Sequence, residues 1–509
     1  MRKSSIFKGG FSMAGDILSI VRSYEQSESP TINPESRPCF HVTPLLGWMN
    51  DPNGFSFYKG EYHLFYQYYP YETIWGPMHW GHVKSKDLIR WEYLPCALAP
   101  DRDYDREGCW SGSALEMPDG RHAIIYTGRM PVNRNEGEEH ILQVQCLAYG
   151  DGVNYEKFEG NPILTEKDLP EGSSRYDFRD PKIWWDQREN AYMMLAGNMA
   201  SDGAGQLLLY RSSDTVHWEF LNILDASHNE YGKMWECPEF FEIGDTAFIL
   251  TSPQETVYGG EFQNRHGNMV ISGTYDPVNH TFERNEVHAI DFGYDFYATQ
   301  TLQTDDGRRI MIAWMQGWEN ASMVRGIACP GWTGMMTLPR ELSVRDGKLI
   351  QTPVRELEAY RHDCVTVKDF SLCGEAVFPG IEGRCIDMSV DLIFPEGTPC
   401  SRFELALARS DEYRNVFACD PISGLITFDR TQSGYINDAL PVRRLQLPPE
   451  MKKLSLRVIL DRYSAEIFVN DGEQVLTSVI ETPQEANGIS FFADAPVILN
   501  IEKYNILIP

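Results

Sequence analysis

The sequence predicts an all-β protein, a five-bladed β-propeller followed by a C-terminal antiparallel β-sandwich. Two observations lead to this prediction: a repeated unit fills the first two thirds of the chain, and a different pattern of strands follows it. A length of 509 residues is also too great for one ordinary domain, so two domains are expected.

The repeated unit is marked by an aspartate with an aromatic residue four positions later. The marker occurs at Asp87, Asp151 and Asp214, and again at Asp276 with the aromatic residue displaced, in steps of 64, 63 and 62 residues. Between markers lie short runs rich in aromatic and β-branched residues, which are typical of strands bounded by turns. The clearest runs are EYHLFYQYY, HAIIYTGR, AYMMLAGN, DTAFILTS and RRIMIAWM. A four-stranded unit that recurs without helices indicates a propeller blade, and five such units fit between residues 36 and 345.

The remaining segments lie before and after the propeller in the sequence. Residues 1–35 are expected to be an N-terminal extension in which DILSIVRSYEQS forms a short amphipathic helix, and residues 346–360 a partly helical linker. Residues 361–509 alternate apolar and polar positions, and Asn470-Asp471-Gly472 supplies turn residues between two such runs. Several alternating strands in a segment of this size predict an antiparallel β-sandwich.

Three acids occupy matching places in the repeat. Asp51 in WMNDPNG, Asp180 in FRDP and Glu236 in WECPE precede their markers by 36, 34 and 40 residues. Trp110 and Ser111 stand at the same phase, 41 and 40 residues before Asp151. Equal phase places all of them on the innermost strands of separate blades, so we expect them to converge at one end of the central channel. Glycosidic bonds are usually cleaved by paired carboxylic acids, and the sequence therefore predicts a site that cleaves a sugar linkage.

Each acid also has a purely structural interpretation. Asp51 could begin a turn, since D-P-N-G is good turn chemistry, and Asp180 before Pro181 could cap another turn. Glu236 could form a buried ion pair with an Arg or Lys. A common phase for all three acids is better explained by one shared site.

Charge and cysteine content restrict the partners and the compartment. The chain has 45 basic and 73 acidic residues, a net charge of −28 and a pI near 4.8, which excludes nucleic acid and anionic membranes as partners. Eleven scattered cysteines without a CxxC pair predict free thiols in a reducing compartment. Lys8 and Asp16 interrupt the start of the chain, so no secretory signal is predicted. We expect a cytoplasmic protein with a small sugar as substrate, and a homo-oligomer is left open.

The motifs resemble glycoside hydrolase family 32, the invertase, inulinase and levanase family. The resemblance covers WMNDPNG, FYQYYP, WGPMHWGH, CWSGS, FRDP, WECPE and DFYATQT, and extends to EIFVNDGE near the C-terminus. It implies a five-bladed propeller followed by a β-sandwich. It also implies a retaining hydrolysis of β-fructofuranosides such as sucrose.

The resemblance gives each acid a role. Asp51 matches the nucleophile that attacks C2 of fructose, Glu236 the acid/base, and Asp180 the residue that stabilises the transition state. A retaining mechanism requires the two reacting carboxyl groups to stand roughly 5 to 5.5 Å apart. Asn50 and backbone amides are expected to keep Asp51 ionised, while the uncharged neighbours of Glu236 are expected to keep it protonated. Glu239 replaces an aspartate that many relatives carry after WECP.

Other positions correspond to binding groups of the family. Arg179 could hold Asp180 charged or contact substrate hydroxyls, and Tyr297 and Trp314 could be further walls of the pocket or core residues. His79 and His82 lack a clear third ligand, so neither a metal nor a cofactor is predicted. The residues expected to line the fructose pocket are Trp48, Met49, Asn50, Gln67, Trp75, Trp110 and Ser111.

The substrate is less well defined. Intracellular family members often hydrolyse sucrose 6-phosphate, and the missing signal favours this sugar, sucrose or short fructo-oligosaccharides. A phosphate would need Arg or Lys near the glucose side of the pocket, where Arg129 and Arg265 are candidates. The alternatives are an exo-acting fructan hydrolase or fructosyltransferase of the same family, an inverting five-bladed glycosidase, and a non-catalytic sugar-binding propeller.

Overall fold

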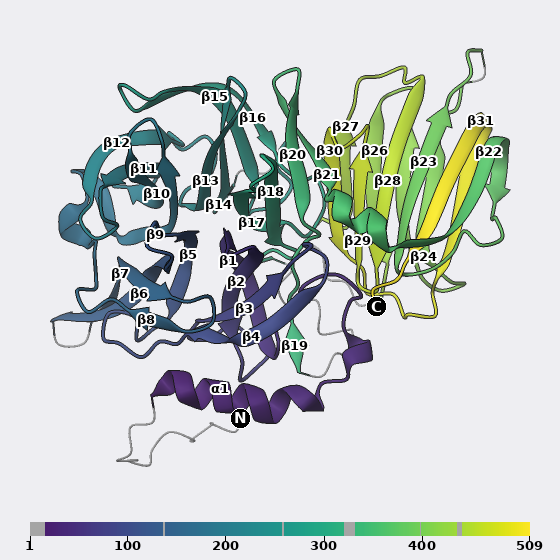
Figure 1. Ribbon diagram of the computed structural model, residues 1–509. Coiled ribbons are helices and arrows are strands. Elements are labelled where there is room, and N and C mark those ends of the chain that lie inside the picture. Colours follow the sequence, from purple (N-terminus) through teal and green to yellow (C-terminus); the bar gives the residue numbers. More distant parts are fainter. Residues whose placement is uncertain (1–15, 136–137, 257–258, 320–330, 398, 435–439) are drawn as a thin grey trace.

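Five small sheets surround one axis, and a larger folded sheet stands beside them in the computed structural model (Figure 1). The structure describes residues 16–135, 138–256, 259–319, 331–397, 399–434 and 440–509. The five-bladed β-propeller and the C-terminal antiparallel β-sandwich are both present, which confirms the predicted fold class.

Each blade is an antiparallel sheet whose first strand lies nearest the axis. The five predicted runs all fall on the second strand of a blade. The fifth blade continues through β21, past residue 345, where the sequence places the end of the propeller. Blade I consists of β1 (Gly47–Tyr58), β2 (Glu61–Tyr69), β3 (His79–Ser85) and β4 (Trp91–Leu98), with β19 (Trp332–Thr333) parallel to β1; blade II of β5 (Cys109–Glu116), β6 (His122–Asn135), β7 (Glu138–Gly150) and β8 (Tyr155–Lys157); blade III of β9 (Ser173–Asp186), β10 (Ala191–Ala200), β11 (Gly205–Ser212) and β12 (Glu219–Ala226); blade IV of β13 (Trp235–Ile243), β14 (Thr246–Pro253), β15 (Met269–Asp276) and β16 (Thr281–Ala289); and blade V of β17 (Tyr297–Gln303), β18 (Arg309–Trp314), β20 (Arg340–Arg345) and β21 (Lys348–Pro353).

The sequence markers are the turns between the third and fourth strands of blades I to IV. Asp87 accepts hydrogen bonds from the backbone N–H groups of Ile89 and Arg90, and Asp214 does the same for Val216 and His217. Such a side chain closes a tight turn by replacing a backbone acceptor. The repeat in the sequence is therefore a repeated hairpin.

The innermost strand of every blade loses its pairing register near the same end. Extra residues are inserted in β1 between Met49 and Pro52, in β5 between Trp110 and Gly112, and in β9 opposite Ala196. The same irregularity occurs in β13 between Glu236 and Glu239, and in β17 between Tyr297 and Gln300. A β-bulge turns a side chain out of the normal alternation, so these five interruptions redirect side chains at one end of the channel.

Apolar clusters fill the spaces between neighbouring blades. Blades II and III, for example, share Ile125 and Leu147 with Phe178, Met194 and Leu208, all of which are fully buried. Burial of this kind supplies most of the favourable free energy of folding. It holds the inner strands at fixed positions around the axis.

The C-terminal sheet folds over a single core that contains Met388, Leu405, Phe417 and Ile467. The turn 470–473 joins β29 to β30, as predicted. Its strands are β22 (Arg361–Ala376), β23 (Ile386–Ile393), β24 (Phe403–Arg409), β25 (Arg414–Asp420), β26 (Leu425–Gln432), β27 (Val442–Gln446), β28 (Lys453–Asp461), β29 (Ser464–Val469), β30 (Gln474–Val479) and β31 (Gly488–Ile506).

The predicted N-terminal helix is α1 (Ile17–Glu28), which begins at the capping residue Asp16. Its buried Glu25 accepts a hydrogen bond from the backbone N–H of Cys96, so the helix lies against β4 of blade I. Within the described part of the chain, no helix has both the length and the apolar composition to cross a lipid bilayer. The short 3-10 helices are η1 (Ser29–Thr31), η2 (Pro34–Ser36), η3 (Glu166–Asp168) and η5 (Arg355–Tyr360).

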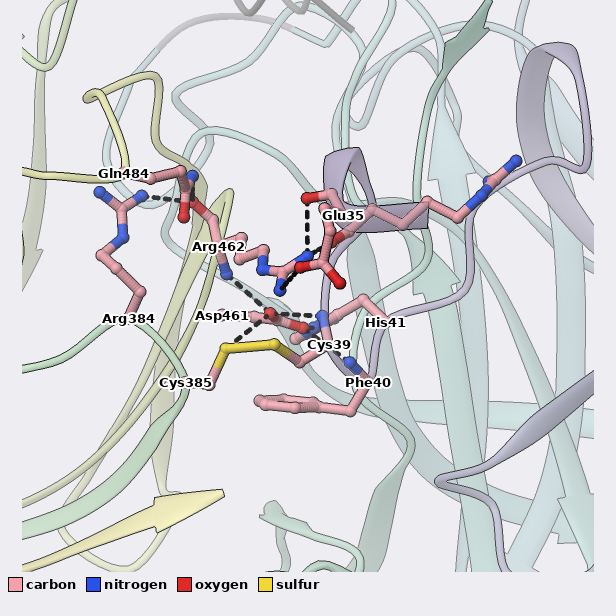
Figure 2. Close-up of a disulfide and its surroundings, with 10 residues drawn as sticks. Glu35, Cys39, Phe40, His41, Arg384, Cys385, Asp461, Arg462 and Gln484 are labelled. Carbon is pink, nitrogen blue, oxygen red and sulfur yellow. Dashed lines mark hydrogen bonds and ion pairs between the residues drawn. A yellow bond between two sulfur atoms is a disulfide. The ribbon is translucent and has the colours of Figure 1, made fainter. Parts of the chain in front are cut away.

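A disulfide and buried ion pairs join the lead-in to blade I with the sandwich. Cys39 is bonded to Cys385, next to Asp461, as Figure 2 shows. The prediction of free thiols throughout is wrong for this pair, because folding brings together two cysteines 346 residues apart in the sequence. His41 lies between the carboxylates of Asp461 and Glu466, at 2.8 and 2.9 Å.

Candidate active site

Side chains from all five inner strands meet at the end of the channel where the bulges occur. Asp51 comes from β1, Ser111 from β5, Asp180 from β9, Glu236 from β13 and Tyr297 from β17. The hydrogen bonds described below link each of them to another blade. Residues far apart in sequence therefore form one site.

Cys237 is a shared donor between two of the acids. Its backbone N–H donates to Oδ2 of Asp180 at 2.9 Å, and its thiol lies 3.6 Å from the same oxygen. The thiol also lies 3.7 Å from Oδ2 of Asp51. Because Glu236 is the residue before Cys237, these contacts bring all three acids together.

Asp51 accepts hydrogen bonds on both oxygens. The amide of Asn50 donates to Oδ1 at 3.0 Å, and the hydroxyl of Ser111 donates to Oδ2 at 2.7 Å. Asn50 is itself oriented by the indole N–H of Trp48 at 2.8 Å. The carboxylate is therefore fixed in direction by donors from two blades.

Asp180 has an unusual backbone conformation. Its φ of 61° is in the left-handed region, which costs a residue with a side chain on the order of 1 kcal/mol, and Cys237 has a φ of 48°. The backbone N–H of Asp180 donates to the hydroxyl of Thr127 at 2.9 Å. Both left-handed residues lie within the bulges, so the strain accompanies the redirection of Asp180.

Glu236 is held by one contact on each oxygen. Arg179 Nε donates to Oε1 at 2.9 Å, and the hydroxyl of Tyr297 donates to Oε2 at 2.5 Å. The sequence neighbours of Glu236 carry no charge, but folding brings Arg179 against its carboxylate, so Glu236 forms the ion pair that the sequence left open as an alternative. Gln143 and Asp177 also accept from Arg179, at 3.1 and 3.4 Å.

Burial dominates the electrostatics of the acids. Burial first, and then the charge of Glu236, raise the pKa of Asp51, although hydrogen bonds from Ser111, Asn50 and Cys237 oppose the shift. The same two causes, in the same order, raise the pKa of Asp180 to about 7. Of the donors expected around Asp51, Asn50 is present, whereas Ser111 and Cys237 take the place of the expected backbone amides, and desolvation outweighs all three. Three buried carboxylates this close cannot all ionise at low cost.

Aromatic rings form the wall around the acids. Trp48 stacks on Trp318 with ring centroids 6.5 Å apart and meets the edge of Trp314 at 6.1 Å. On the side of blade II, Trp75 meets the edge of Trp110 at 6.3 Å. Trp75 is 39% exposed, so it stands at the rim. Flat apolar faces of this kind suit the C–H faces of a sugar.

Several predicted residues lie outside this wall. Met49 points the other way along β1 and is fully buried in the core between blade I and its neighbours. Gln67 is buried and donates to the carbonyl of Cys109 at 3.1 Å, so it supports the strands that carry the site. His79 contacts the carbonyl of Pro77, whereas His82 contacts His63.

Glu239 lies deeper in the channel. It forms a buried ion pair with Lys182 at 2.8 Å. Lys182 lines a cavity of about 880 Å³ formed by the later halves of the inner strands, at the end opposite to the acids. The change from aspartate to glutamate noted in the sequence therefore concerns this ion pair and none of the three acids.

The contacts made by the supporting residues Cys237, Thr127 and Gln143 were not predicted from the sequence. Each acts through a contact between blades, and only the pairing of strands could place it. The x-Pro step shared by Asp51-Pro52, Asp180-Pro181 and Cys237-Pro238 is the one local sign of a bulge.

Comparison with known proteins gives matches over nearly the whole chain. Residues 41–353 match the glycosyl hydrolases family 32 N-terminal domain, and residues 356–505 match the glycosyl hydrolases family 32 C terminal domain. A sucrose-6-phosphate hydrolase of Zymomonas mobilis is 39% identical over 456 residues, covering 87% of this chain and 85% of the relative. A raffinose invertase of Escherichia coli is 36% identical, covering 90% of this chain and 92% of the relative.

Solved structures show the same fold. A family 32 β-fructofuranosidase of Bombyx mori, in complex with sucrose, has a TM-score of 0.81 and 34% identity over 96% of this chain and 98% of its own. A sucrose-6-phosphate hydrolase of Lactobacillus gasseri has a TM-score of 0.82 and 26% identity, covering 97% of both chains.

Proposed function

This chain belongs to glycosyl hydrolase family 32 and is a β-fructofuranosidase, and we propose that it cleaves sucrose and sucrose 6-phosphate through a covalent fructosyl-enzyme on Asp51. The observation that carries the proposal is the meeting of Asp51, Asp180 and Glu236 around Cys237. A turn or a single ion pair would not require three acids from three different blades to lie together.

Asp51 is proposed as the nucleophile. Its Oδ2 accepts from Ser111 and its Oδ1 from Asn50, which fixes the carboxylate for attack on the anomeric C2 of fructose. Attack forms the bond from the carboxylate to C2 as the bond from C2 to the leaving oxygen breaks. The configuration at C2 is inverted in this step and inverted again when water attacks, so the product retains the original configuration.

Glu236 is proposed as the acid and then the base. It gives its proton to the departing oxygen and later takes one from the attacking water. Arg179 and Tyr297 hold its two oxygens in place. After Glu236 has donated its proton, the positive charge of Arg179 stabilises the carboxylate that remains.

Asp180 is proposed to accept hydrogen bonds from two hydroxyls of the fructosyl ring. Burial and the charge of Glu236 raise the pKa of Asp180 to about 7. Bound hydroxyls would stabilise its charged form, and this effect would strengthen as the ring takes on oxocarbenium character.

The stereochemical outcome and the nucleophile can be tested together. Proton NMR during sucrose cleavage should show β-D-fructofuranose as the first fructose formed, and inverted product would exclude the mechanism. Asp51→Ala should abolish turnover, while Asp119→Asn, at an exposed turn of blade II, should not. Denaturing mass spectrometry of Glu236→Gln, quenched during reaction with an activated aryl β-fructofuranoside whose leaving group needs little protonation, should find one fructosyl group on the peptide that contains Asp51. Full activity of Asp51→Ala would refute its role.

A cytoplasmic location is the corresponding proposal for the compartment. A phosphorylated sugar is an intracellular metabolite, but disulfides are rare in the cytosol. Cell fractionation tests the location directly. Rapid alkylation before lysis tests whether Cys39 and Cys385 are bonded in the cell.

A further inference from the structure

Arg129 lies beside the aromatic rim of the proposed active site. It belongs to β6, whose neighbour β5 carries Trp110 and Ser111. The centre of its guanidinium is 4.5 Å from the ring centroid of Trp110 and 5.9 Å from that of Trp75. The two rings therefore orient a cation at the mouth of the site.

Within the described residues, this guanidinium has no ion-pair partner, and its buried Nε has no hydrogen-bond partner. Burial is the main cause that lowers the pKa of Arg129; the charge of Glu107, which does not contact the guanidinium, opposes this shift, and the charge of Arg179 adds to it. Holding a half-buried cation without an anion is costly, and a ligand that brings an anion would recover that cost. Nearby Arg179, by contrast, already contacts Glu236 and Gln143.

Arg129 is linked to the proposed acid through the ring of Trp110. Arg179 lies 5.9 Å from the ring centroid of the same Trp110 and bonds the proposed acid Glu236. The leaving sugar must lie next to Glu236 to receive its proton. Both guanidinium groups therefore lie near the ring of Trp110, Arg179 in contact with the proposed acid and Arg129 toward the exposed Trp75, which is the direction in which a leaving sugar would extend from Glu236.

We propose that Arg129 binds the phosphate of a phosphorylated leaving sugar and so makes sucrose 6-phosphate the preferred substrate, an inference that rests on the proposed function. A guanidinium offers parallel N–H donors that match phosphate oxygens. The protein carries a net charge of −28, so a phosphorylated substrate needs a local cation to offset long-range repulsion. Trp75 and Trp110 would contact the sugar while Arg129 contacts its phosphate.

Arg265 is the other arginine that the sequence suggested, and it has a different environment. Its guanidinium lies 3.8 Å from the carboxylate of Glu255, which Lys233 also contacts at 2.7 Å. Arg265 is therefore a matched control: an arginine that already has an anionic partner.

The test compares substrates in purified enzyme. The ratio of kcat/KM for sucrose 6-phosphate to that for sucrose should fall about 10- to 100-fold in Arg129→Gln, as expected for losing a hydrogen bond to a charged group. The loss should appear mainly in KM, because the phosphate contact is the same in ground and transition states. Arg129→Lys should recover part of the ratio, and Arg265→Gln should leave it unchanged. Glucose 6-phosphate should inhibit the parent enzyme more strongly than glucose, and Arg129→Gln should lose this difference.

Two results would overturn the inference. One is an equal loss on both substrates in Arg129→Gln with an unchanged melting temperature, which would mean that Arg129 only supports the rim. The other is a parent enzyme that does not prefer the phosphorylated sugar. Neither result affects retention on sucrose or its dependence on Asp51, so failure here is distinct from failure of the proposed function.

Discussion

Tyr297 donates a 2.5 Å hydrogen bond to Glu236 from the neighbouring blade. The sequence left Tyr297 as either a wall of the pocket or a core residue, and it is buried and still contacts an acid of the site. Together with Arg179 on the other oxygen, Tyr297 fixes the plane of the carboxyl group. A proton donor with a fixed direction is the requirement for general acid catalysis.

Removing this hydroxyl should slow the chemical step. We expect Tyr297→Phe to lower kcat on sucrose about 10- to 100-fold with little change in KM, because a misplaced acid affects the transition state more than binding. A substrate with an activated aryl leaving group should show a smaller loss, since it needs less protonation. Tyr192→Phe, in β10 away from the site, is the control. Equal losses on both substrates would contradict a role through Glu236.

Removing the Ser111 hydroxyl should change the pH profile. Its hydrogen bond to Asp51 lowers the pKa of that carboxyl and opposes the effect of burial. In Ser111→Ala the pKa of Asp51 should rise further. Because the nucleophile acts in its ionised form, the acidic limb of the kcat/KM profile should move to higher pH. A limb that stays in place would show that Asp51 does not control it.

Asp180→Asn should reduce turnover more than binding. The amide keeps the size of the carboxyl but cannot supply its charge to the developing oxocarbenium ion. We expect kcat to fall about 10²- to 10³-fold, similar to the loss of other preorganised charge stabilisers. Tryptophan fluorescence should still report sucrose binding. Loss of binding with normal turnover at saturation would place Asp180 in recognition only.

Buried histidines should make the protein sensitive to acid. Burial lowers the pKa of His63 and of His79 to about 4 and holds the pKa of His82 and of His122 below the ordinary range. The unfolded chain takes up protons below pH 6.5 while the folded chain does not. The free energy of unfolding should therefore fall as the pH drops from about 6.5 toward 4, by about 1.4 kcal/mol per pH unit for each such group.

Urea unfolding between pH 7 and pH 4.5 measures this loss. His63→Gln should flatten the pH dependence, whereas substitution of the exposed His217 should not. His41 has the opposite sign. Hydrogen bonds to Asp461 and Glu466 outweigh the effect of burial and raise its pKa to about 9, so its contribution is present below pH 6.5 and is lost as the pH rises through 9. A stability that is constant between pH 7 and pH 4.5 would contradict the assignment of neutral buried histidines.

Loss of the Cys39–Cys385 bond should destabilise the folded chain without changing the reaction. A crosslink mainly restricts the unfolded state, and the double variant Cys39→Ser, Cys385→Ser should lose about 2–4 kcal/mol in free energy of unfolding. Cys364→Ser, an exposed free thiol, is the control. Equal urea midpoints for the parent and the double variant would show that the bond contributes nothing.

The sequence predicted the architecture because the information was local. Alternating runs and the aspartate of each hairpin occur in one stretch of chain, so blades could be counted and Asp51, Asp180 and Glu236 placed on inner strands. Contacts between blades could not be predicted in this way. Met49 was assigned to the pocket because it is part of a motif, yet the strand alternation turns it into the core. Arg179 was expected to hold Asp180 charged or to contact substrate hydroxyls; its charge does lower the pKa of Asp180, but its hydrogen bond goes to Glu236, a contact between blades that the sequence could not place.

The five register breaks separate the residues that determine stability from those that determine catalysis. The stability of the fold depends on the outer strands and on the packing between blades. Catalysis depends on a few residues at the bulge of each inner strand. Substitutions in the outer strands can therefore accumulate without changing the reaction. A single substitution at one of the bulges can change the reaction while the propeller fold stays the same.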